Sequence, residues 1–326
     1  MPDTATPRQP AITEPSIIRS LDSDIYHSAT VTPEPAFSAG MGWDMVRKGG
    51  CAAKAWFSSP MNPSFKRKEK AAFDIGSAAH LLFLEPHLYR ASVSIIDADD
   101  WRTKAAKEAR DMARDSGLVP LLSRQHDDIQ EMREALRNVS GLPFDTAPHF
   151  AATAFEGGDA EVSYFWRDPG TGCWCKSRPD YVKPGHLIDF KTSATSDPAD
   201  LPRIASDRGW YLRAAHYLDG HKLLTGEDAD YWFVVQEKEQ PFLTTVCKLD
   251  RNALEWGKKL LPAARAAYAN CLRSGRWPGY AEQAVTIDLP RWADIELQDR
   301  DALGEFDPSR YFDIMKAWQA PLETRA

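Results

Sequence analysis

Hydrophobic and polar residues alternate along the chain with two periods, one typical of strands and one typical of helices. A two-residue period predicts strands over residues 160–167, 174–182, 187–191, 229–237 and 242–249. A longer period predicts helices within residues 37–57 and over residues 72–84, 100–114, 120–139, 201–224 and 250–273. Because the two element types alternate, we predict one α/β core in which helices flank a central mixed β-sheet.

The two ends of the chain differ from this central part. Residues 1–30 are rich in proline, and we predict a flexible N-terminal arm with a short ordered start near residues 17–26. We assign residues 31–293 to a single domain with added N-terminal helices, and residues 294–326 to a C-terminal tail. Asp307, followed by proline, favours the start of a short amphipathic helix in that tail. Its apolar stripe packs on the domain or docks a partner.

The stretch richest in candidate chemistry is the strand pair around the turn at Pro184-Gly185. In its second arm Ile188 and Phe190 share one face, while Asp189 and Lys191 share the other. Asp180 stands nine positions before Asp189, so pairing across the turn brings the two carboxylates together. The simpler interpretation is an internal salt bridge at the end of a strand.

Two convergent carboxylates with a neighbouring lysine suit a hard divalent cation. Mg²⁺ and Mn²⁺ prefer oxygen ligands, and the backbone carbonyl of Phe190 offers a third oxygen beside Asp180 and Asp189. Lys191 is then placed to act on a water molecule at the cation. We therefore predict Asp180, Asp189 and Lys191 as catalytic residues.

This arrangement resembles the signature of the PD-(D/E)xK nuclease superfamily, with its restriction-endonuclease-like core. Pro179-Asp180 stands for the first half of the signature and Asp189-Phe190-Lys191 for the second. The narrower likeness is to the RecE-type exonucleases of phages and prophages, also called exodeoxyribonuclease VIII, and it covers residues 35–293. It rests on an ordered series of stretches: Gly76-x-x-x-His80, Leu84-Glu85-Pro86, residues 168–180, Trp210 to Tyr217, Trp277-Pro278 and residues 289–293.

The resemblance implies roles for further residues. His80 is implied as a metal ligand beside the two aspartates, and Glu85 is a weaker candidate. The family has a glutamine on the helix after the D-x-K strand, where this chain has Arg213. An arginine can clamp phosphate, but it has no amide oxygen with which to orient water.

Four side chains are predicted to contact DNA or its phosphates. Arg213 and Tyr217 share one helix face, which we expect to look onto the site. The guanidinium of Arg178, two residues before Asp180, can donate two parallel hydrogen bonds to a phosphate. Lys176 precedes Arg178 on the same strand. Glu161 lies near the metal or pairs with Lys176 or Arg178, and the sequence leaves both interpretations open.

Composition limits the classes of partner and location. The formal net charge of −7 does not by itself favour a nucleic-acid binder, although a bound cation and local basic groups are compatible with one. Five widely spaced cysteines predict neither a disulfide framework nor an iron–sulfur cluster. With no apolar run of bilayer length and no secretory signal, we expect a cytoplasmic protein of a bacterial or phage-infected cell, without a membrane partner.

Residues and resemblance together predict a Mg²⁺-dependent exodeoxyribonuclease. The resemblance implies 5′-to-3′ digestion of linear double-stranded DNA, which leaves 3′ single-stranded tails for recombination. It also implies a ring-shaped homo-oligomer and a single-strand annealing protein as partner. Two alternatives stay open: a DNA-end-binding protein with impaired catalysis, which Arg213 motivates, and a metal-dependent endonuclease on the same scaffold.

Overall fold

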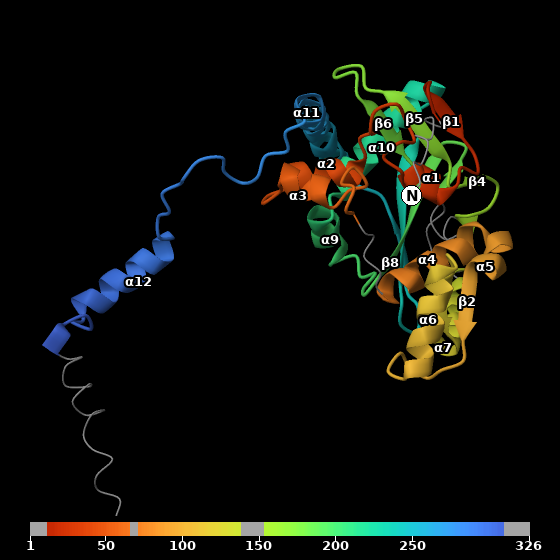
Figure 1. Cartoon of the computed structure of the whole chain (residues 1–326), viewed down its shortest axis with the longest axis horizontal. Coiled ribbons are helices and arrows are strands. Elements are labelled where there is room, and N and C mark those ends of the chain that lie inside the picture. Colours follow the sequence, from red (N-terminus) through yellow and green to blue (C-terminus); the bar gives the residue numbers. More distant parts are fainter. Residues whose placement is uncertain (1–11, 66–70, 138–152, 310–326) are drawn as a thin grey trace, which may run out of the picture. The chain divides into compact units, whose positions relative to one another are not determined.

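The computed structural model describes residues 12–65, 71–137 and 153–309, and the chain divides into two compact units (Figure 1). The second unit, Tyr280–Ala326, holds helix α12 (Arg291–Ala302), which the sequence pattern did not predict. Residues 308 and 309, just after Asp307, are helical, and the apolar stripe of the predicted C-terminal helix lies outside the described residues. Among the described helices, none combines the length and the apolarity that crossing a bilayer requires.

The first unit, Met1–Gly279, contains the sheets and the other described helices. Its strands are β1 (Ser16–Ile18), β2 (Val93–Ile96), β3 (Val119–Leu122), β4 (Asp159–Ala160), β5 (Ser163–Arg167), β6 (Trp174–Ser177), β7 (Tyr181–Lys183), β8 (His186–Ser193), β9 (Asp230–Glu237) and β10 (Thr244–Cys247). Its helices are α1 (Ser23–His27), α2 (Ala39–Val46), α3 (Ala52–Phe57), α4 (Ala71–Leu84), α5 (Pro86–Ser92), α6 (Lys104–Asp115), α7 (Ser123–Arg137), α9 (Leu201–Asp207), α10 (Trp210–Thr225) and α11 (Arg251–Ser274).

The central sheet of the described chain has five strands in the order β10-β9-β8-β7-β4. Strands β8 and β9 run parallel, with Asp189 opposite Phe233, and the other neighbours are antiparallel. Ile188 and Phe190 of β8 pack in a core with α4 and α7, whereas Leu187 packs in a second core with α9 and α10. This arrangement confirms the predicted mixed sheet flanked by helices.

A smaller sheet, in the order β1-β5-β6, lies on α10 and α11 through a core that contains Trp166 and Tyr268. Its strand β1 and helix α1 come from the segment predicted to be a flexible arm. Ile12 and Tyr26 are buried in a cluster with Phe165 of β5. The described part of the arm is therefore a structured layer of the domain, and it is ordered over more residues than the pattern predicted.

Three predicted elements are interrupted in the structure. The strand over residues 160–167 breaks between β4 and β5, and the strand over residues 174–182 breaks between β6 and β7 at Pro179, which has no N–H for a ladder hydrogen bond. The helix over residues 201–224 breaks at Gly209, whose φ of 63° is left-handed and whose missing Cβ leaves room for the Trp43 ring.

The predicted helix over residues 120–139 is also shorter than expected. Its first residues form β3, which pairs in parallel with β2, and α7 begins only at Ser123. The helix predicted over residues 100–114 is present as α6. Local periodicity therefore located α6 well, but it did not separate the buried strand β3 from the helix that follows it.

Gly257 on α11 packs closely against the backbone of α10. A Cβ there would lie 2.1 Å from the carbonyl oxygen of Tyr211, a backbone atom that cannot swing aside. Although alanine favours helix by about 1 kcal/mol over glycine, we expect Gly257→Ala to lower the free energy of unfolding by about 1–3 kcal/mol. Urea denaturation measures this, with Gly40→Ala on α2 as control because nothing lies within 4 Å of its Cβ position. Equal stability of both variants would contradict this packing.

Candidate active site

Two kinks in the chain bring Glu161 and Asp180 together where the chain passes between the two sheets. The chain leaves the five-stranded sheet at Glu161, whose φ of 50° is left-handed, and it returns through Pro179 to Asp180. The backbone N–H of Glu161 donates to the carbonyl oxygen of Asp180 at 3.0 Å, which ties the two kinks to each other. A left-handed non-glycine residue costs about 1–2 kcal/mol, so the fold accepts strain at this position.

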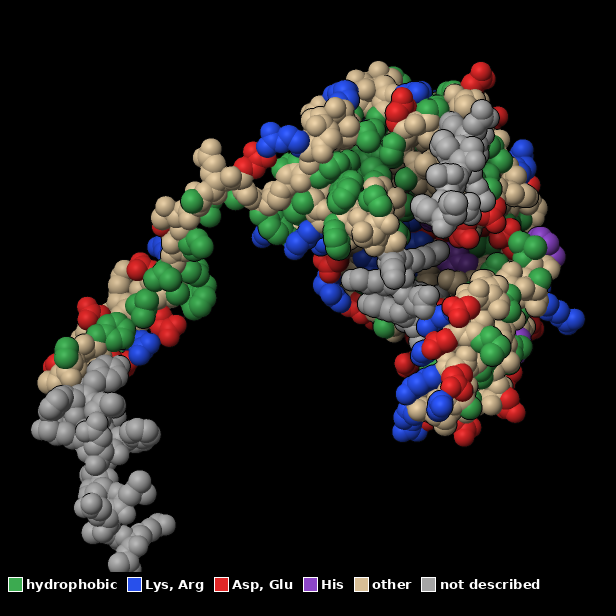
Figure 2. Space-filling view, viewed as in Figure 1, with side chains coloured by type: hydrophobic (Ala, Val, Ile, Leu, Met, Phe, Trp, Pro, Cys, Tyr) green, Lys and Arg blue, Asp and Glu red, His purple; other side chains and the backbone are tan. Residues whose placement is uncertain are grey.

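Helix α4 adds an imidazole to the two carboxylates. The His80 Nδ1 atom lies 3.9 Å from Asp180 Oδ2, and the ring tilts against Phe190 with centroids 5.2 Å apart. Burial, reinforced by the charge of Lys191, lowers the pKa of His80 to about 4. The imidazole is therefore neutral at pH 7, which is the form that ligates metals. Figure 2 shows histidine and acidic side chains together in a recess beside α4.

The fully buried Asp189 of β8 is held by two cationic side chains. Lys191 Nζ donates to its Oδ1, and the Arg213 guanidinium lies 3.9 Å from its Oδ2. Burial opposes ionisation of Asp189, but the charges of Lys191 and Arg213 outweigh burial and lower its pKa. Within the described structure Oδ2 is buried and accepts no hydrogen bond, which is unusual for a carboxylate.

Lys191 also joins the two aspartates. Its Nζ lies 3.8 Å from Asp180 Oδ2 and donates to the carbonyl oxygen of Phe190 at 3.2 Å. Asp180 Oδ2 in turn accepts from the backbone N–H of Phe190 at 2.6 Å. Burial and the negative charge of Asp189 raise the pKa of Asp180 well above its usual range, and burial raises the pKa of Glu161 to about 7. The carboxyl groups of Asp180 and Glu161 are therefore harder to ionise in the fold than in water.

These residues fit a hard divalent cation. Ligand atoms of His80, Glu161 and Asp180 all lie within 4.8 Å of one another, and the unpartnered oxygen belongs to neighbouring Asp189. The convergent set differs in part from the predicted one. Glu161, which was predicted only as a further candidate, belongs to the convergent set. Asp189 does not belong to it, but Lys191 contacts both Asp189 and Asp180 and so links Asp189 to the set.

Three other predicted residues border this cluster. Arg213 and Tyr217 lie on the same face of α10, with the guanidinium carbon 5.8 Å from the ring centroid. One third of the Arg213 side chain is exposed, so it reaches the surface of the recess. Glu85 precedes α5, and its negative charge adds to burial in raising the pKa of Glu161.

Lys176 and Arg178 have structural partners instead of facing the recess. Lys176 Nζ donates to the carbonyl oxygen of Tyr26 at 2.6 Å, and Arg178 donates to Ser163 and to the carbonyl oxygen of Leu21, each at 2.8 Å. Both cations stack on the Tyr26 ring. Their predicted contact with DNA phosphate therefore has no support, because the fold uses both groups to hold the N-terminal segment. Glu161 lies 3.9 Å from Arg178, which is one of its two predicted surroundings, and its carboxylate also belongs to the candidate metal ligands.

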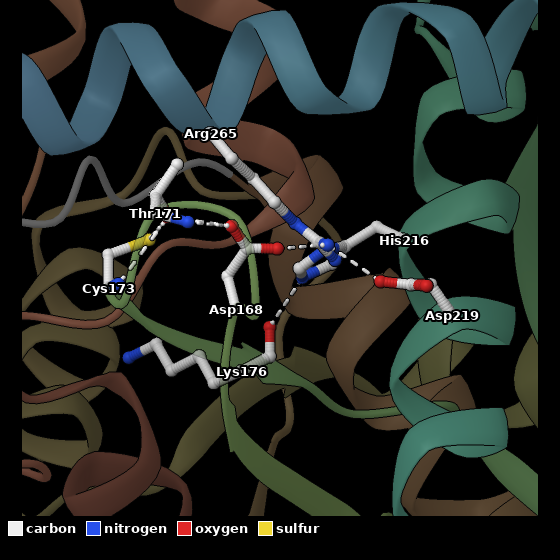
Figure 3. A network of polar contacts seen from close by, with 7 residues as sticks. All are labelled: Asp168, Thr171, Cys173, Lys176, His216, Asp219 and Arg265. Atoms are coloured by element: carbon white, nitrogen blue, oxygen red, sulfur yellow. Dashed lines mark hydrogen bonds and ion pairs between the residues drawn. The ribbon is translucent and has the colours of Figure 1, made fainter.

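A buried polar network that the sequence pattern did not reveal fixes helix α10 (Figure 3). Arg265 of α11 donates to Asp168 at 2.8 Å, to Asp219 at 2.6 Å and to His216 Nδ1 at 2.9 Å. Because arginine only donates, His216 Nδ1 must accept, and its Nε2–H donates to the carbonyl oxygen of Lys176 at 3.1 Å. Burial and the charge of Arg265 lower the pKa of His216 well below its usual value, in agreement with a neutral ring.

This network fixes the two parts of the fold that carry residues of the site. His216 lies three residues after Arg213 on α10, and Asp168 lies in the turn between β5 and β6. The same contacts therefore fix the helix that carries Arg213 and the strand pair that leads to Asp180. Sequence reasoning could not find the network, because its members come from three distant segments and local sequence does not show that these segments meet.

The mixed sheet, the D-x-K strand and the acids gathered at its edge define a PD-(D/E)xK-type α/β protein. The chain belongs to the family described as the PDDEXK-like domain of unknown function, which residues 46–290 match. Its fold is similar to a crystal structure from Eubacterium rectale described as "Putative exonuclease", with a TM-score of 0.57 and 13% identity. That similarity covers 85% of this chain and 98% of the other. No curated protein matches the chain in sequence.

Proposed function

We propose that this chain is a metal-dependent deoxyribonuclease that digests linear double-stranded DNA from its ends. The observation that carries the proposal is the convergence of His80, Glu161 and Asp180 beside a buried Asp189–Lys191 pair. A structural salt bridge explains Asp189 and Lys191, but it does not explain a neutral histidine and two further acids at the same place. The similarity to a protein described as an exonuclease points in the same direction.

The proposed roles follow from the positions of the side chains. His80, Glu161 and Asp180 would hold Mg²⁺ or Mn²⁺, and Asp189 would offer its unpartnered Oδ2. A divalent cation, when bound, supplies Lewis acidity toward the scissile phosphate and lowers the pKa of water. Lys191 orients the attacking water and balances the negative charge that develops on the phosphate.

Arg213 has a role of its own in this proposal. Its guanidinium is one-third exposed and lies at the edge of the recess, so it can grip a phosphate oxygen while it stays close to Asp189. It thus replaces the glutamine of RecE-type exonucleases by a permanent cation. This contact with phosphate offsets part of the electrostatic repulsion between DNA and a chain whose formal net charge is −7.

The finer features of the proposal rest on the motif series shared with RecE-type exonucleases. They are 5′-to-3′ polarity, 3′ single-stranded tails for recombination, a ring-shaped homo-oligomer, and an annealing protein as partner in a bacterial or phage-infected cytoplasm. The order of the motifs supports these features, from Gly76-x-x-x-His80 through Asp189-Phe190-Lys191 to Trp277-Pro278.

Removal of the metal tests the proposal directly. With Mg²⁺ or Mn²⁺ the protein is expected to degrade linear duplex DNA and to spare covalently closed circles, and a chelator should stop digestion completely. Duplexes labelled at either the 5′ or the 3′ end report polarity through the order in which label is released. Digestion that continues in the presence of the chelator would contradict the metal-dependent site.

A second candidate function is DNA-end binding without cleavage. It is favoured by the guanidinium of Arg213, 3.9 Å from Asp189 Oδ2, because this cation occupies part of the space around the carboxylate. Retention of linear DNA in a gel, with no digestion under either cation, would favour this alternative. Cutting of closed circles would instead identify an endonuclease.

A further inference from the structure

Arg213 is held opposite Asp189 by charge and not by a hydrogen bond. Its Nη1 atom lies 3.9 Å from Asp189 Oδ2, which is beyond hydrogen-bond length. In the part of the chain that the structure describes, this buried oxygen has no hydrogen-bond partner. An arginine that is fixed on a carboxylate typically forms two short parallel hydrogen bonds with it. Arg213 is therefore attracted to Asp189 but is not locked onto it.

The helix that carries Arg213 is fixed on both sides of this residue. Three residues before it, the Trp210 ring stacks on Phe233 with centroids 4.4 Å apart. Four residues after it, the Tyr217 ring packs edge-on against Tyr231 with centroids 5.6 Å apart. One third of the Arg213 side chain is nevertheless exposed. The guanidinium can therefore turn outward by a change of side-chain rotamer, while α10 stays in place.

A divalent cation in the proposed site and the Arg213 guanidinium compete for the same negative charge. Lys191 donates to Oδ1 of Asp189, so Oδ2 is the oxygen that is open both to Arg213 and to a cation. Asp180 adds to the negative charge that attracts the guanidinium. Two positive charges at short range repel each other strongly where water is excluded. A bound cation and an inward-facing Arg213 therefore disfavour each other.

We infer that Arg213 couples the binding of the cation to the binding of DNA. In the free protein the guanidinium faces Asp189 and opposes entry of the cation. A DNA phosphate at the edge of the recess turns the guanidinium outward, which leaves Oδ2 of Asp189 to the cation. Because both ligands favour the outward position, each raises the affinity for the other by the same factor. This coupling rests on the proposed nuclease site and adds a control to it, because DNA promotes the loading of the metal.

The coupling needs the permanent charge of arginine. The glutamine that RecE-type exonucleases carry at this position is neutral, so it neither repels a divalent cation nor pairs with phosphate as an ion. Replacement of Arg213 by a neutral residue therefore removes both halves of the coupling, the repulsion of the cation and the attraction of the phosphate. Each half can be measured without DNA cleavage.

The affinity of the DNA-free protein for Mn²⁺ tests the repulsion. Electron paramagnetic resonance measures unbound Mn²⁺ and gives the Kd. Arg213→Met, which supplies no oxygen ligand, and Arg213→Gln are each expected to bind Mn²⁺ about 10-fold more tightly than the wild type. Arg213→Lys keeps the charge and should stay close to the wild type. Arg203→Met is the matched control and should leave the Kd unchanged, because Arg203 pairs with Asp207 on the exposed surface of α9.

The affinity for DNA tests the attraction. Fluorescence anisotropy of a labelled linear duplex, with phosphorothioate linkages that resist hydrolysis, gives the Kd for DNA in EDTA and in saturating Mn²⁺. The ratio of the two Kd values is the coupling factor between metal and DNA. It is expected to be about 10-fold larger in the wild type than in Arg213→Met, where only a direct contact of the ion with phosphate remains. Arg203→Met should give the wild-type ratio.

The outcomes separate the coupling from the nuclease function on which it rests. Equal Mn²⁺ affinity of the wild type and the neutral variants would overturn the coupling, and so would an equal coupling factor. In both cases Mn²⁺ still binds, so the proposed nuclease site would stand. If neither the wild type nor the neutral variants bound Mn²⁺, the metal site and the coupling would fail together. The unfolding temperature of each metal-free variant shows that the fold is retained.

Discussion

Replacement of Lys191 by methionine is expected to lower the rate of DNA cleavage by about 10²–10³-fold, as removal of one positioned electrostatic group does in other enzymes. Lys191 Nζ contacts both carboxylates of the signature, Asp189 directly and Asp180 at 3.8 Å. Methionine keeps most of the side-chain volume but removes the charge and all three donors. The rate is measured with end-labelled linear duplex under saturating Mg²⁺.

Two controls separate catalysis from folding. Lys222→Met removes a lysine that pairs with Asp228 on the surface at 2.9 Å, where exposed pairs contribute little stability, and it should leave the rate unchanged. Retention of linear DNA in a gel by Lys191→Met would show that binding survives. Cleavage by this variant within an order of magnitude of the wild type would remove Lys191 from the proposed mechanism.

The chemistry of β8 was predictable because a strand fixes the direction of its side chains. A two-residue period places Asp189 and Lys191 on one face whatever the rest of the fold does. The turn after β7 then sets the register, in which Tyr181 pairs with Ile188, so that Asp180 falls opposite Asp189 in the next pair. Both conclusions need only local sequence.

The position of Glu161 was not predictable in the same way. Alternation over residues 160–167 predicts one strand, but the chain must pass from the five-stranded sheet to the smaller sheet within it. The kink at Glu161 makes that passage, and periodicity carries no information on which sheet a strand joins. The hydrogen bond from Glu161 to the Asp180 carbonyl, which gathers the acids, exists only after both sheets have formed.

The partners of Lys176 and Arg178 were not predictable from the sequence for a related reason. Lys176 and Arg178 stand beside the signature in sequence, which favoured a phosphate-binding role for both. Their partners are residues of the N-terminal segment, Leu21 and Tyr26, some 150 positions earlier. Only the folded chain shows that Lys176 and Arg178 already have hydrogen-bond partners. The proline-rich composition of residues 1–30 gave no sign that this segment would be structured and supply them.

Replacement of Asp180 by asparagine is expected to abolish both metal binding and cleavage, yet to leave the metal-free protein at least as stable as the wild type at pH 7. Burial and the charge of Asp189 raise the pKa of Asp180, so its ionised form is disfavoured in the folded state. The pKa of this carboxyl is higher in the folded state than in the unfolded state, where it is near 4. At any pH above about 4, ionisation of Asp180 therefore costs folding stability. Asparagine removes that cost and still accepts from the N–H of Phe190 with its amide oxygen.

A thermal-unfolding titration with Mn²⁺ measures both halves of this expectation. A ligand at one hundred times its Kd stabilises the folded state by about 2.7 kcal/mol, so the wild type should unfold at a higher temperature with Mn²⁺, and Asp180→Asn should not. Asp228→Asn, at an exposed carboxylate, is the control and should keep the full shift. A Mn²⁺ shift that persists in Asp180→Asn would place the ion elsewhere. A metal-free Asp180→Asn that unfolds well below the wild type would contradict the expectation that ionisation of Asp180 costs stability in the fold.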